Sequence, residues 1–125
     1  MHQSNDPILV AIAKAMNMNH PIEDCMWSYA SPEARRNICW AMNQRFSGKW
    51  ITVCACVDEL WVNKLFLQLD TECDYLLLCA IEWRRLSDIK TEFVKGSVVT
   101  MKVRFKEITL ECGSDLVPTV VCTPY

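Results

Sequence analysis

The first strongly apolar stretch of the chain runs from Pro7 to about Met18 and follows a helix start signal. Asp6 supplies a carboxylate that can cap the first free N–H groups, and the fixed φ of Pro7 suits the first turn. Lys14 is the only charge in the stretch, so the predicted helix has no wide polar face. Such a helix is expected to be buried, either within the fold or against a partner.

Two more helices are predicted before the first strand. His20-Pro21 opens one that runs to about Tyr29, with apolar residues at helical spacing. Ser31-Pro32-Glu33 repeats the start signal for the next, which runs to about Phe46 and ends at Ser47-Gly48. The residues expected to face the core from this last helix are Ile38, Cys39, Met42 and Phe46.

The segment from Trp50 to Val57 is apolar at both odd and even positions, which is typical of a strand covered on both faces. Asp58 then suits the N-cap of a helix that runs to Leu69. Its expected inward residues are Val62, Leu65, Phe66 and Leu69. Because Tyr75 to Ile81 is again continuously apolar, the order predicts two parallel strands joined by a crossover helix.

The rest of the chain predicts antiparallel strands. Residues 89–93 alternate, Lys95-Gly96 supplies a turn, and a long strand starts at Val98, as expected of a hairpin. The apolar phase slips by one after Lys106-Glu107, which indicates a bulge or a sharp bend. The segment 116–122 contains Pro118 and is expected at a sheet edge. The predicted class is therefore α+β, with about three N-terminal helices, a strand-helix-strand unit and an antiparallel hairpin or meander in one mixed sheet.

Length and composition fit one compact domain over residues 1–125, since the chain is 51% hydrophobic and can bury a core. Residues 1–6 are expected to be a flexible tail, 7–46 helical, and 50–122 mostly sheet with one helix. The N-terminal residues lack the basic and apolar pattern of a secretory signal, and no apolar stretch near them spans a bilayer. We therefore expect an intracellular protein, cytoplasmic or nuclear, that does not enter a membrane.

Eight cysteines suggest a choice between thiols, disulfides and a metal site. Without an export signal, reduced thiols are the default. Only Cys54 and Cys56 form a close pair, and the two histidines, His2 and His20, are not placed to complete a zinc site, which needs four convergent ligands. Buried, inert thiols are the preferred interpretation. The acidic triplet Asp70, Glu72 and Asp74 fails the spacing of a calcium loop and is expected to be solvated.

No catalytic motif emerges, and we expect neither an enzyme nor a cofactor. The chain has only three glycines, so that no phosphate-binding loop or nucleophile elbow can be assembled from a known motif. Cys25 with His20 is the one conceivable nucleophile and base, and its signal is weak.

Two surfaces are better candidates for binding. Opposite the apolar stripe of the predicted helix 32–46, a tryptophan lies among groups that can form hydrogen bonds, and Trp and Arg are enriched at interface hot spots. The residues are Arg36, Trp40, Asn43 and Gln44. On one face of the predicted long strand lie the bases Lys102, Arg104 and Lys106. Two structural alternatives stay open, since Trp40 can pack within the fold and edge strands carry lysine to prevent aggregation.

Charge is segregated along the chain although its net value is only −2. Residues 34–57 hold four bases and no acid, 58–82 hold six acids and one base, and 84–106 hold seven bases and two acids. If the two basic segments meet in space, they present a positive face to an acidic protein or to nucleic acid.

The leading hypothesis is a non-enzymatic protein-interaction module, such as a small inhibitor, adaptor or accessory factor. Small proteins of this kind are common among viral and phage accessory factors, so that a host-virus interaction belongs to this hypothesis. The alternative is nucleic-acid binding, in which a helix-turn-helix-like segment over 21–46 offers its second helix to DNA. That helix carries Arg35, Arg36, Asn37, Asn43 and Gln44. A third alternative is a homo-oligomer formed through the N-terminal helix.

Overall fold

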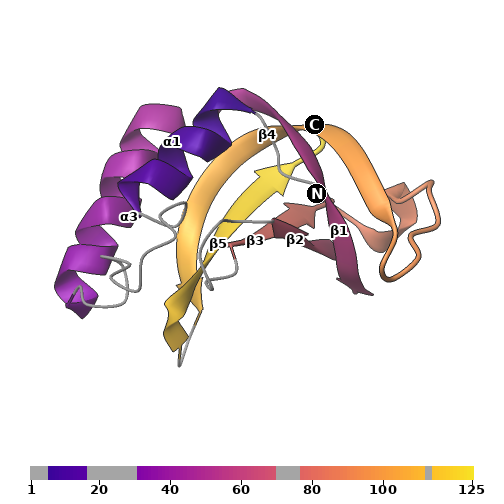
Figure 1. The fold of residues 1–125 in the computed structure, drawn as a ribbon. Helices are drawn as coiled ribbons and strands as arrows, with labels where there is room; N and C mark the ends of the chain where they lie inside the picture. Colours follow the sequence, from indigo (N-terminus) through magenta and orange to yellow (C-terminus); the bar gives the residue numbers. More distant parts are fainter. Residues whose placement is uncertain (1–5, 17–30, 70–76, 112–113) are drawn as a thin grey trace.

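A computed structural model describes residues 6–16, 31–69, 77–111 and 114–125 (Figure 1). In these ranges two α-helices precede five strands, and a single 3₁₀ turn lies between the third and fourth strands. The elements are α1 (Pro7–Ala15), α3 (Pro32–Phe46), β1 (Trp50–Trp61), β2 (Lys64–Leu69), β3 (Leu77–Glu82), η1 (Leu86–Asp88), β4 (Val98–Glu111) and β5 (Ser114–Thr123).

The five strands form a closed barrel in the order β1-β2-β3-β5-β4. Closure depends on the length of β1, which pairs with β4 through residues 50–56 and with β2 through residues 56–61. A register shift between Val57 and Glu59 inserts Asp58 as an extra residue where β1 passes from one neighbour to the other. Such a bulge increases twist and helps a strand to bend around a barrel.

The predicted architecture is therefore wrong. In the described residues two helices, not about three, precede the barrel, and the strand-helix-strand unit does not exist. The segment 58–69, predicted as a helix, finishes β1 and forms β2. Its leucines alternate, with Leu65, Leu67 and Leu69 all buried inside the barrel. The predicted second helix, 21–29, lies outside the described residues.

Three further predictions about the sheet are corrected. The strand before residue 58 has no parallel partner, since β1 pairs antiparallel with both neighbours and the parallel pair is β3 with β5. Residues 89–93 form a loop rather than a hairpin strand. Pro118 is not at an edge, because it opposes Leu110 of β4 and the next residue of β5 pairs with β3. The predicted slip near Lys106 is confirmed as a register shift between Phe105 and Glu107.

The two helices lie side by side against the barrel and share its core (Figure 1). The predicted helix from Pro7 is confirmed and ends at Ala15. Ile12 of α1 is fully buried, and the ring of Phe46 at the end of α3 meets Phe105 of β4 edge to face. The Asp6 carboxylate accepts one bond from Ile8 N, which caps α1, and a second from Thr52 N of β1 at 2.8 Å. One side chain thus starts α1 and ties it to the barrel.

The end of α3 is fastened to β4 along the part of that strand that lies beyond β1. Gly48 N donates to Phe105 O at 2.8 Å, and the Ser47 hydroxyl donates to Lys106 O. These bonds satisfy polar groups of β4 that have no partner strand on that side. Neither α1 nor α3 has the length and apolar content of a membrane-spanning helix, and no other α-helix occurs in the described ranges.

Candidate functional site

The helix surface consists of Arg36, Trp40 and Gln44, one turn apart on the outer side of α3. The helix begins with Ser31, whose hydroxyl accepts from Ala34 N, followed by Pro32 in the first turn. Trp40 is 65% exposed, and Arg36 and Gln44 are also exposed. The Trp40 ring is therefore exposed to solvent between Arg36 and Gln44, two side chains that can donate hydrogen bonds.

Asn43 does not belong to this surface, although the sequence places it there. Its Oδ1 accepts from Ile108 N at 2.6 Å, and its Nδ2 donates to Ile108 O at 3.3 Å. The side-chain amide thereby pairs with β4 much as a neighbouring strand would. Asn43 sits one turn after buried Cys39, at the border between the two faces of α3, which explains why the helical pattern alone misplaces it.

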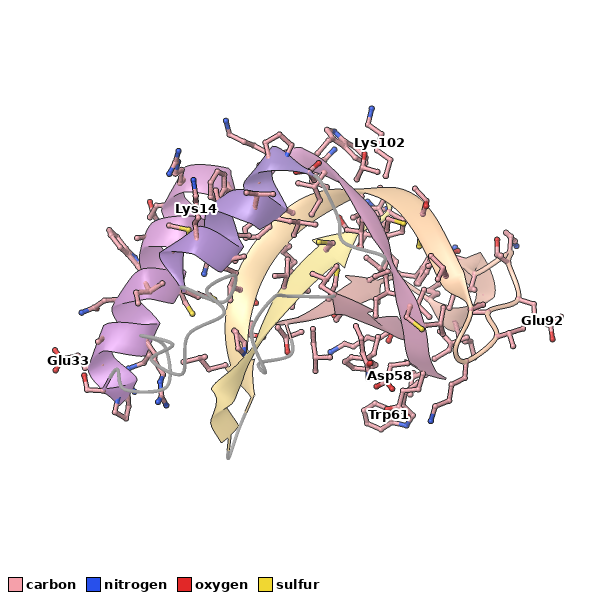
Figure 2. The ribbon with its side chains drawn as sticks, viewed as in Figure 1. Lys14, Glu33, Asp58, Trp61, Glu92 and Lys102 are labelled. Atoms are coloured by element: carbon pink, nitrogen blue, oxygen red, sulfur yellow. The ribbon has the colours of Figure 1, made fainter. Side chains whose placement is uncertain are left out.

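The second surface, the basic ladder, comprises Trp50 and Thr52 of β1 with Lys102 and Arg104 of β4. The register pairs Trp50 with Arg104 and Thr52 with Lys102. The Arg104 guanidinium lies over the Trp50 ring, 5.0 Å from its centroid, and Trp50 is 45% exposed. Lys102 points away from the barrel into solvent (Figure 2). The outward positions 50–56 and 98–104 carry no carboxylate, so the ladder is positively charged.

Lys106 leaves the ladder because the register of β4 shifts there. Its Nζ lies 3.7 Å from Glu82 Oε1 of β3, and the same carboxylate pairs with Lys64 at 3.5 Å. In the described part of the chain, Lys102 and Arg104 form no ion pair. Of the three bases predicted on one strand face, Lys102 and Arg104 therefore have no ion-pair partner among the described residues, while Lys106 is partly neutralised. The Asp6 carboxylate, bonded to Thr52 N, adds one negative charge beside the ladder.

The structure also brings the two basic segments of the sequence together. Residues 50–56 pair with 98–104, and Lys49 O accepts from Phe105 N, so that Lys49 lies beside the part of β4 that carries Arg104 and Lys106. The helix surface lies on α3, and residues 47–49 join α3 to β1, the strand that carries Trp50 and Thr52 of the basic ladder. The sequence predicted a positive face only if these segments met, and that condition is fulfilled.

Five-stranded barrels include the OB fold, whose members bind oligonucleotides and oligosaccharides over strands 2 and 3. In this chain the corresponding outer face of β2 and β3 has one cation, Lys64, and it pairs with Glu82. The remaining residues of that face are Phe66, Gln68 and Leu78, which are half-buried, and Ala80, which is buried. A face without free positive charge is poorly suited to phosphates, and an architecture alone does not specify a function.

The nucleic-acid alternative on α3 loses two of its five predicted contact residues. Arg35 is buried, and Asn43 is bonded to Ile108. Arg36, Asn37 and Gln44 are exposed. The first helix of the proposed helix-turn-helix lies outside the described residues.

The five described cysteines form no disulfide with one another and lie in the core or on the outer side of β1. Burial raises the pKa of Cys39 to about 11. Cys79 and Cys122 lie in the barrel core, where the Cys79 thiol donates a hydrogen bond to Cys122 Sγ at 4.0 Å. This hydrogen bond, together with burial, raises the pKa of Cys79. Cys54 and Cys56 are half-buried on the outer side of β1, not covered on both faces as predicted. Among the described residues no three His, Cys, Asp or Glu side chains gather as a metal site. The candidates His20, Cys25 and the triplet at 70–74 lie outside them.

One exposed apolar segment was not predicted from the sequence, the β1–β2 tip, formed by Leu60, Trp61 and Val62. These side chains are 40%, 66% and 59% exposed at the turn between the two strands. Val62 has φ of 57°, the one positive φ of a described residue other than glycine. A branched side chain there costs roughly 1–2 kcal/mol. The alternation of the leucines after Asn63 could have revealed the hairpin, but the same residues also fit a helix.

Comparison with models of protein families finds no match, and no curated protein sequence is similar to the chain.

Proposed function

We propose that the chain is a non-enzymatic protein-interaction module, a small inhibitor, adaptor or accessory factor that binds another protein through the helix surface and the basic ladder. The exposure of Trp40 on a firmly held helix carries the proposal. Tryptophan and arginine are among the residue types most enriched at interface hot spots. Because Asn43 and the C-cap residue Ser47 bond α3 to β4, little ordering is needed when a partner covers the outer side of the helix.

The basic ladder supports a partner with an acidic surface. Lys102 and Arg104, which have no ion-pair partner among the described residues, can attract carboxylates at a distance and fix the orientation of docking. Arg104 is already ordered over Trp50, which presents a cation and an aromatic edge together.

The test is to identify a partner by affinity capture from the source organism and then to measure its affinity for purified variants. Trp40→Ala should weaken binding at least tenfold, about 1.4 kcal/mol, with the melting temperature unchanged. Lys102→Glu/Arg104→Glu should also weaken binding of the partner. Its affinity should fall further below that of wild type as the salt concentration is lowered, because less salt screens the charges less. Val10→Ala, which shortens an exposed apolar side chain on α1, is the matched control and should bind like wild type. Equal affinities for wild type and Trp40→Ala would remove the helix surface from the proposal.

Nucleic-acid binding is separated from this proposal by a labelled oligonucleotide in place of the protein partner. Binding that weakens steeply as salt rises, and is lost in Lys102→Glu/Arg104→Glu but not in Trp40→Ala, would assign the ladder to phosphates instead.

A further inference from the structure

Strand β4 is longer than its neighbour β5, although the strand order closes the barrel. β5 ends at Thr123, which pairs with Arg104, and β4 extends from there back to Val98 (Figure 1). On one side this part of β4 pairs with β1. On its other side it has no partner strand among the described residues. This unpaired side of residues 98–102 is the free edge of β4.

Backbone groups of every second residue lie on the free edge. Phe105 N donates to Lys49 O, so that the odd-numbered residues of β4 before this point direct their N–H and C=O groups to β1. In an antiparallel pair the residues between them point the other way. The residues that direct both groups to the free edge are Val98, Thr100 and Lys102. None of these groups forms a hydrogen bond in the described part of the chain, and such an edge can pair with another chain.

The core is also less well covered where β5 is missing. Val99 and Met101 lie on the core side of β4, yet both are only half-buried. Val103 and Phe105, which lie beside the end of β5, are fully buried on the same side of the strand. Successive side chains of a strand point to opposite faces of a sheet. An extended segment on the free edge would therefore cover Val99 and Met101 with every second side chain if those side chains were apolar.

The outer side of the free edge favours acidic residues. Lys102 and Arg104 are exposed and have no ion-pair partner among the described residues. The Asp6 carboxylate bonds to Thr52 N on the side of β1 that faces away from β4. The loop over 84–97, which leads into β4, holds four bases and two acids. A carboxylate opposite a base on a neighbouring strand is favourable, whereas lysine on an edge disfavours neutral or basic strands.

We propose that an extended segment of a partner protein adds to the free edge as a further strand, antiparallel to β4 and in line with β5. Its inward residues are apolar and cover Met101, and its outward residues are acidic and lie opposite Lys102. Main-chain hydrogen bonds supply affinity in strand addition, and alternate side chains supply specificity. This inference rests on the proposed function, because Lys102 belongs to the basic ladder, and it specifies the conformation and chemistry of the partner segment.

The experiment titrates the ¹⁵N-labelled full chain with a short synthetic peptide of alternating valine and glutamate. In the free chain, NMR should show fast hydrogen exchange at the amides of Val98, Thr100 and Lys102 and slow exchange at those of Val99 and Met101, which are bonded to β1. The peptide should slow exchange at the three amides of the free edge. Replacement of its glutamates by lysine should weaken binding at least tenfold.

Methylation of the peptide nitrogens tests the main-chain hydrogen bonds separately from the side chains. In an antiparallel pair, residues that lie opposite one another point to the same face, so the glutamates direct their N–H groups to β4. Methylation at the glutamate nitrogens should therefore weaken binding at least tenfold. Methylation at the valine nitrogens is the matched control and should have little effect.

Two variants of the chain test the same bonds from the other side. Thr100→Pro removes one N–H of the free edge, whereas Thr100→Val keeps it. Because this N–H does not bond to β1, proline is compatible with the strand. We expect Thr100→Pro to bind the peptide at least tenfold more weakly and Thr100→Val to bind it like wild type. If Thr100→Pro does not fold, the two methylated peptides still decide with the wild-type chain.

Three results would overturn the inference. The amides of the free edge could already be protected in the free chain, or the two methylated peptides could bind alike. The same amides could also shift as the concentration of the chain alone rises, which would assign the free edge to a second copy. The proposed function fails separately, when the captured partner binds Trp40→Ala and Lys102→Glu/Arg104→Glu as well as wild type. A partner that is sensitive to those variants but binds Thr100→Pro like wild type would remove only the added strand.

Discussion

At Val62 a single backbone angle lowers the stability of the fold. Its exposed side chain has little burial to lose, while its φ of 57° is costly for a branched residue. Glycine adopts this angle freely but raises the entropy of the unfolded chain, which offsets part of the gain. Val62→Gly should therefore increase the free energy of unfolding, by about 1 kcal/mol.

Chemical denaturation of purified protein measures this difference directly. Val94→Gly is the matched control, because Val94 is equally exposed in a loop and has no positive φ. The free energy of unfolding of Val94→Gly should fall by roughly 0.5–1 kcal/mol, because glycine raises the entropy of the unfolded chain. A Val62→Gly variant that is destabilised as much as Val94→Gly would show that the turn is not strained.

Burial of Cys39 leads to a second prediction for a single residue, the pH dependence of stability. Burial raises the pKa of its thiol from 9.0 to about 11, so the folded state favours the neutral form. The corresponding stability is complete below pH 9 and is lost as pH rises from about 9 to about 11, by roughly 2 kcal/mol. Unfolding free energies of wild type and Cys39→Ala, measured from pH 8 to pH 11, should therefore converge. Curves that stay parallel over this range would contradict the assignment.

At the scale of elements, the contact between α3 and β4 depends on one amide. Asn43→Leu removes the partners of both Ile108 N and Ile108 O, and unsatisfied polar groups cost about 1–3 kcal/mol each. Since Asn43 is only half-buried and water can reach part of the site, we expect the free energy of unfolding to fall by about 2 kcal/mol. Asn43→Asp keeps the acceptor and should lose less.

Gln44→Ala, the neighbouring exposed position, is the control and should change stability by less than about 0.5 kcal/mol. Hydrogen exchange gives an independent measurement, because the Ile108 amide should exchange faster in Asn43→Leu while amides of β2 are unaffected. Unchanged protection of Ile108 would mean that the Asn43 side chain is not its partner.

Local start signals were predictable from the sequence, and pairing between distant segments was not. Asp6-Pro7 and Ser31-Pro32 begin the two helices, as their capping chemistry indicates. Over 58–69, however, spacings of three and four coexist with strict alternation, and only tertiary contacts decide between them. The segment 64–69 is a strand because, as β2, it pairs with both β1 and β3 and so closes the barrel.

The same limit applies to the candidate site. Residues 36, 40 and 44 share a helix face by geometry alone, so their exposure followed from the pattern once the opposite face was apolar. The partner of Trp50 could not be predicted, since it depends on the register between β1 and β4. Lys106 was misplaced because a bulge turns it toward Glu82, a residue two strands away.

For the whole molecule, the distribution of charge matters more than its sum. The net charge is −2, yet the basic ladder has no carboxylate at its outward positions. Such a patch can hold an acidic protein on a cation exchanger when the resin contacts only one face. We expect wild type to be retained at pH 7 and low salt, and to elute as ionic strength screens the interaction.

Two double variants with the same net charge isolate the patch from the total. Lys102→Glu/Arg104→Glu and Lys90→Glu/Lys95→Glu each change the net charge from −2 to −6, but only the first pair lies on the ladder. The first should lose retention on the cation exchanger, whereas the second should keep most of it, because its lysines lie in the loop before β4. If both variants elute together, retention follows net charge, and the ladder does not act as a distinct electrostatic surface.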